Sequence, residues 1–343
     1  MKASKITNAL LVSIAVVIIL IYGKPLLLPF VVALIFWFLI KEIRELLYRI
    51  PFVKKKVHIS ILNLVGFLTI FLIIGGIVKI LSMNIKQLST SMPIYQENIK
   101  LITASIEAST DFEIGAFIKE FVGEYDYTNN LKIIFTSLKD LFGKAFLIII
   151  YVLFLLLEEP FFQHKIKKIF LGEKEKRTET IQILSQIDRS IGRYISLKTL
   201  TSLITGISSY IALLFIGIEA PLFWAFLIFV MNFIPTIGSL IATIFPALFA
   251  MLQFGDIMPG ISTLIIVGVI QLIVGNYVDP KLMGDSLNVS PLIVIIGLAF
   301  WGAIWGIIGM ILSVPISAML ILIFANVPNS RSIAILLSKK GNV

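Results

Sequence analysis

Long apolar blocks, separated by short polar or basic stretches, set the hydrophobic pattern of this 343-residue chain. Ten blocks can be distinguished: Ala9–Tyr22, Leu26–Ile40, Ile61–Leu81, Leu141–Leu157, Thr199–Ile218, Pro221–Phe233, Ile237–Phe254, Ile261–Tyr277, Pro291–Trp301 and Gly306–Ala325. A helix needs about 20 predominantly apolar residues to cross a bilayer, so several blocks are short. The pattern predicts an all-α polytopic membrane protein with about eight transmembrane helices, in which some short blocks are re-entrant hairpins.

Composition supports a membrane protein over a soluble one. Hydrophobic residues make up 58% of the chain, and the mean hydropathy is +1.00. The first block follows two lysines, as in a signal peptide, but no cleavage site of small residues follows it. Ala9–Tyr22 and Leu26–Ile40, joined by Gly23–Lys24–Pro25, are therefore interpreted as a retained helical hairpin.

Basic residues gather in two polar stretches and determine the predicted topology. Lys41–Ser60 has six lysines and arginines against two glutamates, and Glu158–Lys198 has nine against six acidic residues. The positive-inside rule places both stretches and both chain termini in the cytoplasm, so the net charge of +9 does not indicate a nucleic-acid partner. Apolar positions at helical spacing predict an amphipathic helix at Thr178–Leu197. Membrane lipid is an expected partner, and the basic segments Lys54–Lys56 and Lys165–Arg177 are candidates for binding anionic headgroups.

The stretch Ser82–Lys139 differs from the rest because it is moderately polar and has few basic residues. Seven acidic residues stand against five lysines, and apolar residues recur at helical spacing, as at Tyr95, Ile99 and Ile102. We expect an extracytoplasmic module of amphipathic helices. The predicted organisation is therefore a hairpin with a third membrane helix (1–81), this module (82–139), a membrane helix with a basic segment (140–198), a C-terminal membrane bundle (199–326) and a cytoplasmic tail (327–343).

Catalytic and metal-binding motifs are missing from the sequence. The chain has no cysteine, and its two histidines, His58 and His164, lie in basic stretches where solvated surface positions are expected. The P-loop, GxSxG and HExxH motifs do not occur, and the few ionisable residues near membrane depth form no catalytic dyad. The sequence therefore predicts no enzyme, cofactor or metal site, and favours a gradient-driven transporter or a channel-like facilitator.

A polar break at Gln271–Pro291, between two apolar blocks, is the first candidate site. Irregular backbone at membrane depth is tolerated only inside protein or beside water. Asn276 and Asp279 can share a helix face, and Pro280 is predicted to end that helix. Gln271, Asn276, Asp279 and Lys281 are candidates for binding a substrate or a coupling ion. The alternative is a helix terminus at the cytoplasmic interface, where Asp279 and Lys281 simply face water.

A second break lies at Pro235–Ser239, between two further apolar blocks. Asn232, Pro235 and Gly238 are candidates for an unwound segment that presents backbone groups to a substrate. The alternative is a tight turn between two helices, and both interpretations can hold together. Further along the chain, Gly302, Gly306 and Gly309 are expected to allow close helix packing.

Three blocks in the C-terminal half carry a recognisable combination of motifs. They read NFIPTIGSLIATIFPAL (Asn232–Leu248), QLIVGNYVDPKLMGDSLNVSPLIV (Gln271–Val294) and WGAIWGIIGMILSVPISAML (Trp301–Leu320). Together with the early hairpin they resemble the autoinducer-2 exporter family of bacterial membrane permeases. The positions that carry the resemblance, apart from the candidate site residues, are Pro280, Gly284, Pro291, Gly302, Gly306, Gly309 and Pro315.

The resemblance implies a homo-oligomeric permease of the bacterial inner membrane that exports a small solute such as autoinducer-2. Exchange of sodium or potassium for protons is the first alternative, and it assigns proton transfer to Asp279. The second alternative is a scaffold without transport activity, whose outer module Ser82–Lys139 binds a partner. A flux assay separates the three, because only the first needs an organic substrate and the last shows no flux.

Overall fold

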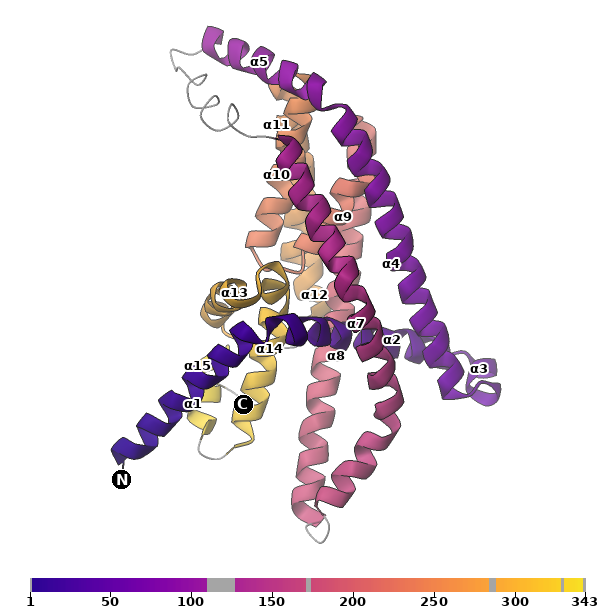
Figure 1. The fold of residues 1–343 in the computed structure, drawn as a ribbon, viewed down its shortest axis with the longest axis vertical. Helices are drawn as coiled ribbons and strands as arrows, with labels where there is room; N and C mark the ends of the chain where they lie inside the picture. Colours follow the sequence, from indigo (N-terminus) through magenta and orange to yellow (C-terminus); the bar gives the residue numbers. More distant parts are fainter. Residues whose placement is uncertain (1, 110–126, 171–173, 284–287, 328–329, 342–343) are drawn as a thin grey trace. The chain divides into compact units, whose positions relative to one another are not determined.

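The computed structural model describes residues 2–109, 127–170, 174–283, 288–327 and 330–341. Its helices are α1 (Lys2–Tyr22), α2 (Lys24–Tyr48), α3 (Pro51–Lys56), α4 (Ile59–Thr90), α5 (Met92–Ser109), α7 (Tyr127–Ile169), α8 (Lys174–Ile216), α9 (Pro221–Met231), α10 (Ile237–Phe254), α11 (Ile257–Ile273), the π-helix η1 (Val274–Val278), α12 (Asp279–Met283), α13 (Pro291–Trp305), α14 (Ile307–Ala325) and α15 (Arg331–Leu337) (Figure 1). Within these ranges the only β-type pairing is an isolated bridge between Val289 and Ser338. The predicted all-α class is confirmed.

Seven of the described helices are long and apolar enough to cross a membrane. These candidate spans are Lys24–Tyr48, Ile59–Leu88, Lys144–Phe162, Arg177–Ile216, Ile237–Phe254, Ile257–Leu282 and Ile307–Ala325. Three further apolar helices, Leu11–Tyr22, Pro221–Met231 and Pro291–Trp305, are shorter. The ten apolar blocks of the sequence thus all form helices, and seven reach spanning length where the pattern predicts about eight. The protein is a polytopic membrane protein.

Several helices continue past the ends of their apolar blocks. The helix α2 continues to Tyr48, well into the basic stretch expected to be a loop, and α4 continues to Thr90. The amphipathic helix expected at Thr178–Leu197 and the span that follows it form one 43-residue helix, α8. Lysine, arginine, glutamate and leucine are good helix formers, and α8 contains no proline. Where an apolar block ends, the helix therefore leaves apolar surroundings for polar ones, but its backbone hydrogen bonds continue without a break.

The chain divides into two compact units, each described by itself. The first unit comprises Met1–Ile70, Gly143–Ser196 and Asp285–Val343. Its core includes Leu28 of α2, Trp305 of α13 and Leu312 of α14, which are all buried. The Trp305 indole Nε1 donates a hydrogen bond of 3.1 Å to the carbonyl of Leu20 in α1. The early hairpin is thus attached to the two C-terminal membrane helices by packing and by one hydrogen bond.

Arg44 links three helices within the first unit. Its guanidinium donates to both oxygens of Glu159 in α7, at 2.7 and 3.0 Å, and to Asn63 Oδ1 in α4 at 2.8 Å. The arginine side chain is only 10% exposed. Fork-shaped pairing of this kind fixes both the distance and the orientation of the partner carboxylate. A basic residue of the predicted loop therefore has a structural role inside the helical bundle.

The second unit comprises Phe71–Phe142 and Leu197–Gly284. Within it, α5 is attached to the end of α10, because Asn98 Nδ2 donates to the carbonyls of Leu252 and Gln253 at 2.9 Å each. Orphan carbonyls at the end of a helix need partners of this kind. The Tyr95 ring packs edge-on against Phe249, with 5.3 Å between ring centroids. This part of the expected outer module therefore packs against helices of the second unit; residues 110–126 of the module lie outside the described residues.

Replacing Tyr95 by phenylalanine is expected to lower the free energy of unfolding by about 1–3 kcal/mol, because the hydroxyl donates a 2.5 Å hydrogen bond to Glu219. Tyr95 lies outside the candidate spans. Burial, and then the hydrogen bond to Glu219, raise the pKa of Tyr95. A group with a raised pKa contributes stability that is fully present below its ordinary pKa, about 10 for tyrosine, and is lost as the pH rises above it. Thermal unfolding in detergent between pH 8 and 11 tests this, and equal alkaline sensitivity in both proteins would contradict it.

Candidate functional site

A stripe of small polar residues runs along one face of α8 inside the second unit. Thr201, Ser202, Thr205 and Ser209 are each 0% exposed, and Lys198 begins the stripe at 7% exposed. Residues three and four apart share a helix face, so these side chains lie one above another. Each buried hydroxyl needs a hydrogen-bond partner, and two find one on their own helix: Thr201 Oγ1 donates to the Lys198 carbonyl at 3.2 Å and Thr205 Oγ1 donates to the Thr201 carbonyl at 2.9 Å.

Asn232, the residue directly after α9, donates hydrogen bonds to two of these hydroxyl groups. Its Nδ2 donates to Ser202 Oγ at 3.2 Å and to Thr205 Oγ1 at 3.4 Å. Asn232 itself is 7% exposed. The predicted site residue Asn232 is therefore directed at the polar face of α8 and is enclosed by protein.

Lys198 and Asp279 form the charged end of the stripe. Lys198 Nζ donates to Asp279 Oδ2 at 2.8 Å, and the two side chains are 9% and 19% exposed. Removing two charges from water is costly, and their attraction compensates for this cost only when geometry and further hydrogen bonds are good. In the following, Lys198, Ser202, Thr205, Asn232 and Asp279 are called the polar cluster. One candidate residue from each of the two predicted breaks, Asn232 and Asp279, thus forms hydrogen bonds with the polar face of α8.

Several polar atoms in this unit are buried without a hydrogen-bond partner in the described part of the chain, and three of them lie on α8, α11 and α12. These three are Oδ1 of Asp279, Nε2 of Gln271 and Oγ of Ser209. The carboxylate oxygen is an acceptor, the amide nitrogen is a donor, and the hydroxyl can be either. Each such atom costs about 1–3 kcal/mol unless water or a ligand completes it. The unused donors and acceptors are of the kind that hydroxyl groups of a small polar solute satisfy.

The backbone before Asp279 corrects one prediction. The sequence pattern predicts that a helix ends at Asp279 because Pro280 follows, and this prediction is wrong. The π-helix η1 leads directly from α11 into α12, which contains Pro280 near its start. The first turn of a helix tolerates proline, since the missing N–H would be unpaired there, and the wider π turn allows the helix axis to continue. Asp279 is consequently placed inside a continuous helical segment that belongs to a candidate span, Ile257–Leu282.

The second break forms a tight turn between α9 and α10. Thr236 has a positive φ of 61°, and the amide of Ile237 donates to the carbonyl of Pro235 at 2.6 Å. A non-glycine residue at positive φ stores strain, which is found preferentially at functional positions. Gly238 is buried next to the Met231 carbonyl, whereas Pro235 is half-buried. Of the candidates at this break, only Asn232 belongs to the polar cluster.

Two further candidates do not join the cluster. Asn276 and Lys281 are exposed, although Asn276 lies one turn before Asp279. The expected pairing of Asp279 with its sequence neighbour Lys281 is replaced by the pair with Lys198. The family-signature proline Pro280 is also exposed, and Gly284 lies outside the described residues.

The remaining signature residues lie in the first unit, around the α13–α14 hairpin. Gly306 connects the helices with a φ of +67°, a conformation that glycine adopts readily. A Cβ atom on Gly309 would lie 2.0 Å from the carbonyl oxygen of Trp301, and one on Gly302 would lie 3.0 Å from Met310. Pro315 is buried within α14, and Pro291 begins α13. These residues contribute to the packing of one hairpin.

The residues that sequence reasoning misses are the hydroxyls of α8. Lys198 is visible in the sequence as an ionisable residue near membrane depth, but nothing local identifies its partner. The spacing of Thr201, Ser202, Thr205 and Ser209 is a usable signal, since polar residues three and four apart mark one face of a helix. No group of three or more histidine, aspartate or glutamate side chains in the described residues is arranged to hold a metal ion.

Comparisons with known proteins agree with the membrane architecture. A family model described as AI-2E family transporter matches residues 9–329. The AI-2 transport protein TqsA of Escherichia coli is 27% identical over 92% of this chain and 90% of its own length. A Haemophilus influenzae protein, named as a transport protein, is 27% identical over 95% of both chains. A Borreliella burgdorferi protein with the same kind of name is 36% identical, in a match that covers about half of each chain (56% and 53%).

The match to the family model spans nearly the whole chain, and two relatives align over nine-tenths or more of their length. It includes all the helices that contribute to the polar cluster and the complete α13–α14 hairpin. The chain is a membrane permease and belongs to the AI-2E transporter family.

Proposed function

We propose that this permease exports a small hydroxylated solute of the autoinducer-2 class from the bacterial cell, driven by an ion gradient, and that the polar cluster binds the solute. The observation that carries the proposal is the buried Lys198–Asp279 pair, which leaves one carboxylate oxygen without a partner. Ionisable residues inside membrane segments are costly and are retained chiefly for transport functions. The relative from Escherichia coli, which is named for AI-2 transport, supports the substrate class.

The chemistry of the cluster suits a neutral solute with several hydroxyl groups. Asp279 Oδ1 in the cluster is free to accept a hydrogen bond, and Gln271 Nε2 on α11, outside the cluster, is free to donate one, whereas a hydroxyl group can do both. The charges of Lys198 and Asp279 balance each other, so a neutral solute leaves the electrostatics of the site unchanged. Binding without covalent chemistry is sufficient for such a role, and we assign no catalytic residue.

A second candidate function, exchange of sodium or potassium for protons, is favoured by the same aspartate. Protonation of Asp279 would leave Lys198 without a counter-charge in a buried position, and an incoming cation would compete with Lys198 for the carboxylate. Either event changes the charge balance of the cluster. Proton or cation binding can therefore drive a rearrangement of the helices that carry these residues.

Replacing Asp279 by asparagine is expected to abolish gradient-driven flux and to lower the unfolding temperature, because Lys198 then lacks its counter-charge. The asparagine side-chain oxygen still accepts the hydrogen bond from Lys198, but the negative charge is lost. The measurement uses purified protein in liposomes, with autoinducer-2 on one side and an imposed proton, sodium or potassium gradient. Uptake of autoinducer-2 supports export of this solute class, whereas proton flux coupled to sodium or potassium alone supports antiport.

The control for this measurement is Lys281→Met, which removes an exposed charge two residues further along the same helix. It should leave flux and thermal unfolding close to those of the unaltered protein. Full flux in the Asp279→Asn variant would contradict a role for this carboxylate. Absence of solute and ion flux under every gradient would contradict both transport functions and favour the scaffold alternative.

We also propose an inner-membrane location with cytoplasmic termini and a homo-oligomeric assembly. The basic stretches Lys41–Ser60 and Glu158–Lys198 support this orientation, and the family resemblance supports the assembly. Labelling of single cysteines introduced into the cysteine-free chain would test the orientation from either side of the membrane. Light scattering of the purified protein would test the number of subunits.

A further inference from the structure

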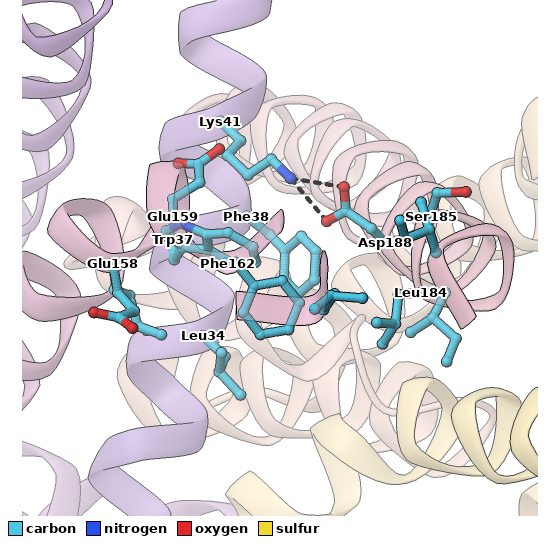
Figure 2. Close-up of a pocket in the computed structure, with 14 residues that line it drawn as sticks. Leu34, Trp37, Phe38, Lys41, Glu158, Glu159, Phe162, Leu184, Ser185 and Asp188 are labelled. Carbon is cyan, nitrogen blue, oxygen red and sulfur yellow. Dashed lines mark hydrogen bonds and ion pairs between the residues drawn. The ribbon is translucent and has the colours of Figure 1, made fainter. Parts of the chain in front are cut away.

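The first unit contains a cavity that is separate from the polar cluster. It has a volume of about 410 Å³ and lies between α2, α7 and α8 (Figure 2). Most of its wall is aliphatic or aromatic, with Leu34, Phe38, Leu155 and Phe162 among the lining residues. Two carboxylates in the wall are already neutralised by ion pairs, Glu158 with Lys165 and Glu159 with Arg44. Its size and its largely apolar wall with few polar groups are typical of sites for small organic molecules.

Two hydrogen-bond donors lie together in the wall of this cavity. The Trp37 indole Nε1 is buried and has no partner in the described part of the chain. Lys41 Nζ lies 4.5 Å from the centre of the Trp37 ring and contacts Asp188 at 2.7 and 2.8 Å. An ammonium group has three N–H donors, of which one aspartate can use at most two. Figure 2 shows Lys41 extending toward Asp188, with the rings of Phe38 and Phe162 beside the pair.

These donors would remain unsatisfied if only hydrocarbon filled the cavity. A buried N–H group without a partner costs about as much as a lost hydrogen bond, and this cost is removed when a ligand supplies an acceptor. The rings of Phe38 and Phe162 lie beside these donors, so a ligand that fills the cavity combines an acceptor group with a hydrocarbon part. This combination describes an amphiphile.

The location of the cavity indicates where such an amphiphile would come from. The wall residues of α2 lie in the second half of the apolar block Leu26–Ile40 and directly after it, and those of α7 lie toward the end of the candidate span Lys144–Phe162 or just beyond it. On α7, Leu157 and Phe161 are 67% and 60% exposed, so the surface beside the cavity is apolar and suited to lipid. Tryptophan and lysine are typical of the level at which lipid headgroups meet the hydrocarbon.

We infer that this cavity, lined by Trp37, Lys41, Leu155, Phe162, Leu184 and Asp188, is a binding site for a membrane phospholipid. Its phosphate accepts hydrogen bonds from Trp37 Nε1 and from the remaining N–H of Lys41. Part of an acyl chain lies against the leucine and phenylalanine side chains. Asp188, whose side chain is 40% exposed, stays hydrated and keeps Lys41 in place.

A bound phospholipid would join three helices that come from distant parts of the sequence. The cavity wall combines α2 with the end of the apolar block of α7 and with the part of α8 that precedes its apolar block. The lipid would therefore act as a structural ligand of the first unit, and its presence would raise the unfolding temperature.

The test is native mass spectrometry of the full-length protein in detergent, titrated with dioleoylphosphatidylglycerol. Dioleoylglycerol, which lacks the phosphate, and inorganic phosphate, which lacks the chains, serve as comparison ligands. We expect the phospholipid to bind at least tenfold more tightly than either. If dioleoylglycerol bound as tightly as the phospholipid, the two donors would have no role in binding. If inorganic phosphate bound as tightly, the acyl chains would have no role, and the site would not be a lipid site.

Two variants locate the binding in the cavity. Trp37→Phe keeps an aromatic ring but removes the N–H, and is expected to weaken phospholipid binding about tenfold, as for loss of one hydrogen bond to a charged group. The double variant Leu155→Trp/Leu184→Trp fills the cavity and is expected to abolish binding. The matched control, Leu153→Trp/Leu157→Trp, adds the same side chains to exposed positions of α7 and should bind as the unaltered protein does. Equal binding by the cavity-filled and control proteins, or unchanged affinity in Trp37→Phe, would overturn the proposal.

Discussion

Replacing Lys198 by methionine is expected to destabilise the second unit by about 3–5 kcal/mol and to abolish transport. The substitution leaves Asp279 buried and charged, with one oxygen that already lacks a partner and a second that has lost its donor. Solvent screens little of this effect, since the two side chains are 9% and 19% exposed. Thermal unfolding in detergent measures the loss of stability, and flux into liposomes measures transport.

A double variant distinguishes the structural role of this pair from its role in transport. Lys198→Met combined with Asp279→Met replaces both charges by apolar side chains, which is often neutral or stabilising for a buried ion pair. We expect the double variant to recover the unfolding temperature and to remain inactive. If it recovered transport as well, the pair would serve packing alone, and the polar cluster would lose its assigned function.

Replacing Gly238 by alanine is expected to lower the free energy of unfolding more than an alanine at any other described glycine of the second unit. A Cβ atom at this position would lie 1.8 Å from the Met231 carbonyl oxygen and 2.9 Å from the side chain of Ile234. Backbone atoms cannot move aside as a flexible side chain does, so the turn between α9 and α10 must open. Overpacking of this kind costs about 1–3 kcal/mol or more.

The matched control is the same substitution at Gly75, in the middle of α4. Nothing lies within 4 Å of a Cβ atom there. Alanine within a helix is favoured over glycine by about 0.5–1 kcal/mol, so Gly75→Ala should keep or raise the unfolding temperature. Thermal unfolding of both variants measures the contrast. A Gly238→Ala protein as stable as the control would show that the turn is looser than these distances indicate.

Much of the fold follows from the sequence because burial in a bilayer leaves a simple signal. Every apolar block corresponds to a helix, since helices alone satisfy their backbone groups within one segment. Helix ends are less predictable where polarity and helix propensity disagree. The stretch after Ile40 is basic, which predicts a loop, but its residues favour a helix, and α2 continues through them to Tyr48.

The candidate site is only partly predictable for a related reason. Asn232, Gln271 and Asp279 stand out because a polar residue is conspicuous among apolar neighbours, and all three lie in the second unit with mostly buried side chains. Their partners on α8 are distant in the sequence, by 81 residues for Lys198 and Asp279. Pairing over such separations depends on how the helices pack, which periodicity within one segment does not specify. Asn276 is a candidate because it can share a helix face with Asp279, and Lys281 because it can pair at the predicted helix end, but both side chains are exposed and neither belongs to the cluster.

The π-helix before Asp279 determines which residues of α11 and α12 face the same way. In a regular α-helix, Gln271 and Asp279 would point about 80° apart around the axis. A π turn accommodates about one extra residue, which turns the later side chains back and brings these two within about 20° of each other. The five residues Val274–Val278 thus set the direction in which the side chains after them point around the helix axis. Conversion of this segment to a regular α-helix without loss of a residue would leave the composition unchanged and yet rotate the carboxylate by about 100°, away from Lys198, whereas a one-residue deletion would keep its direction.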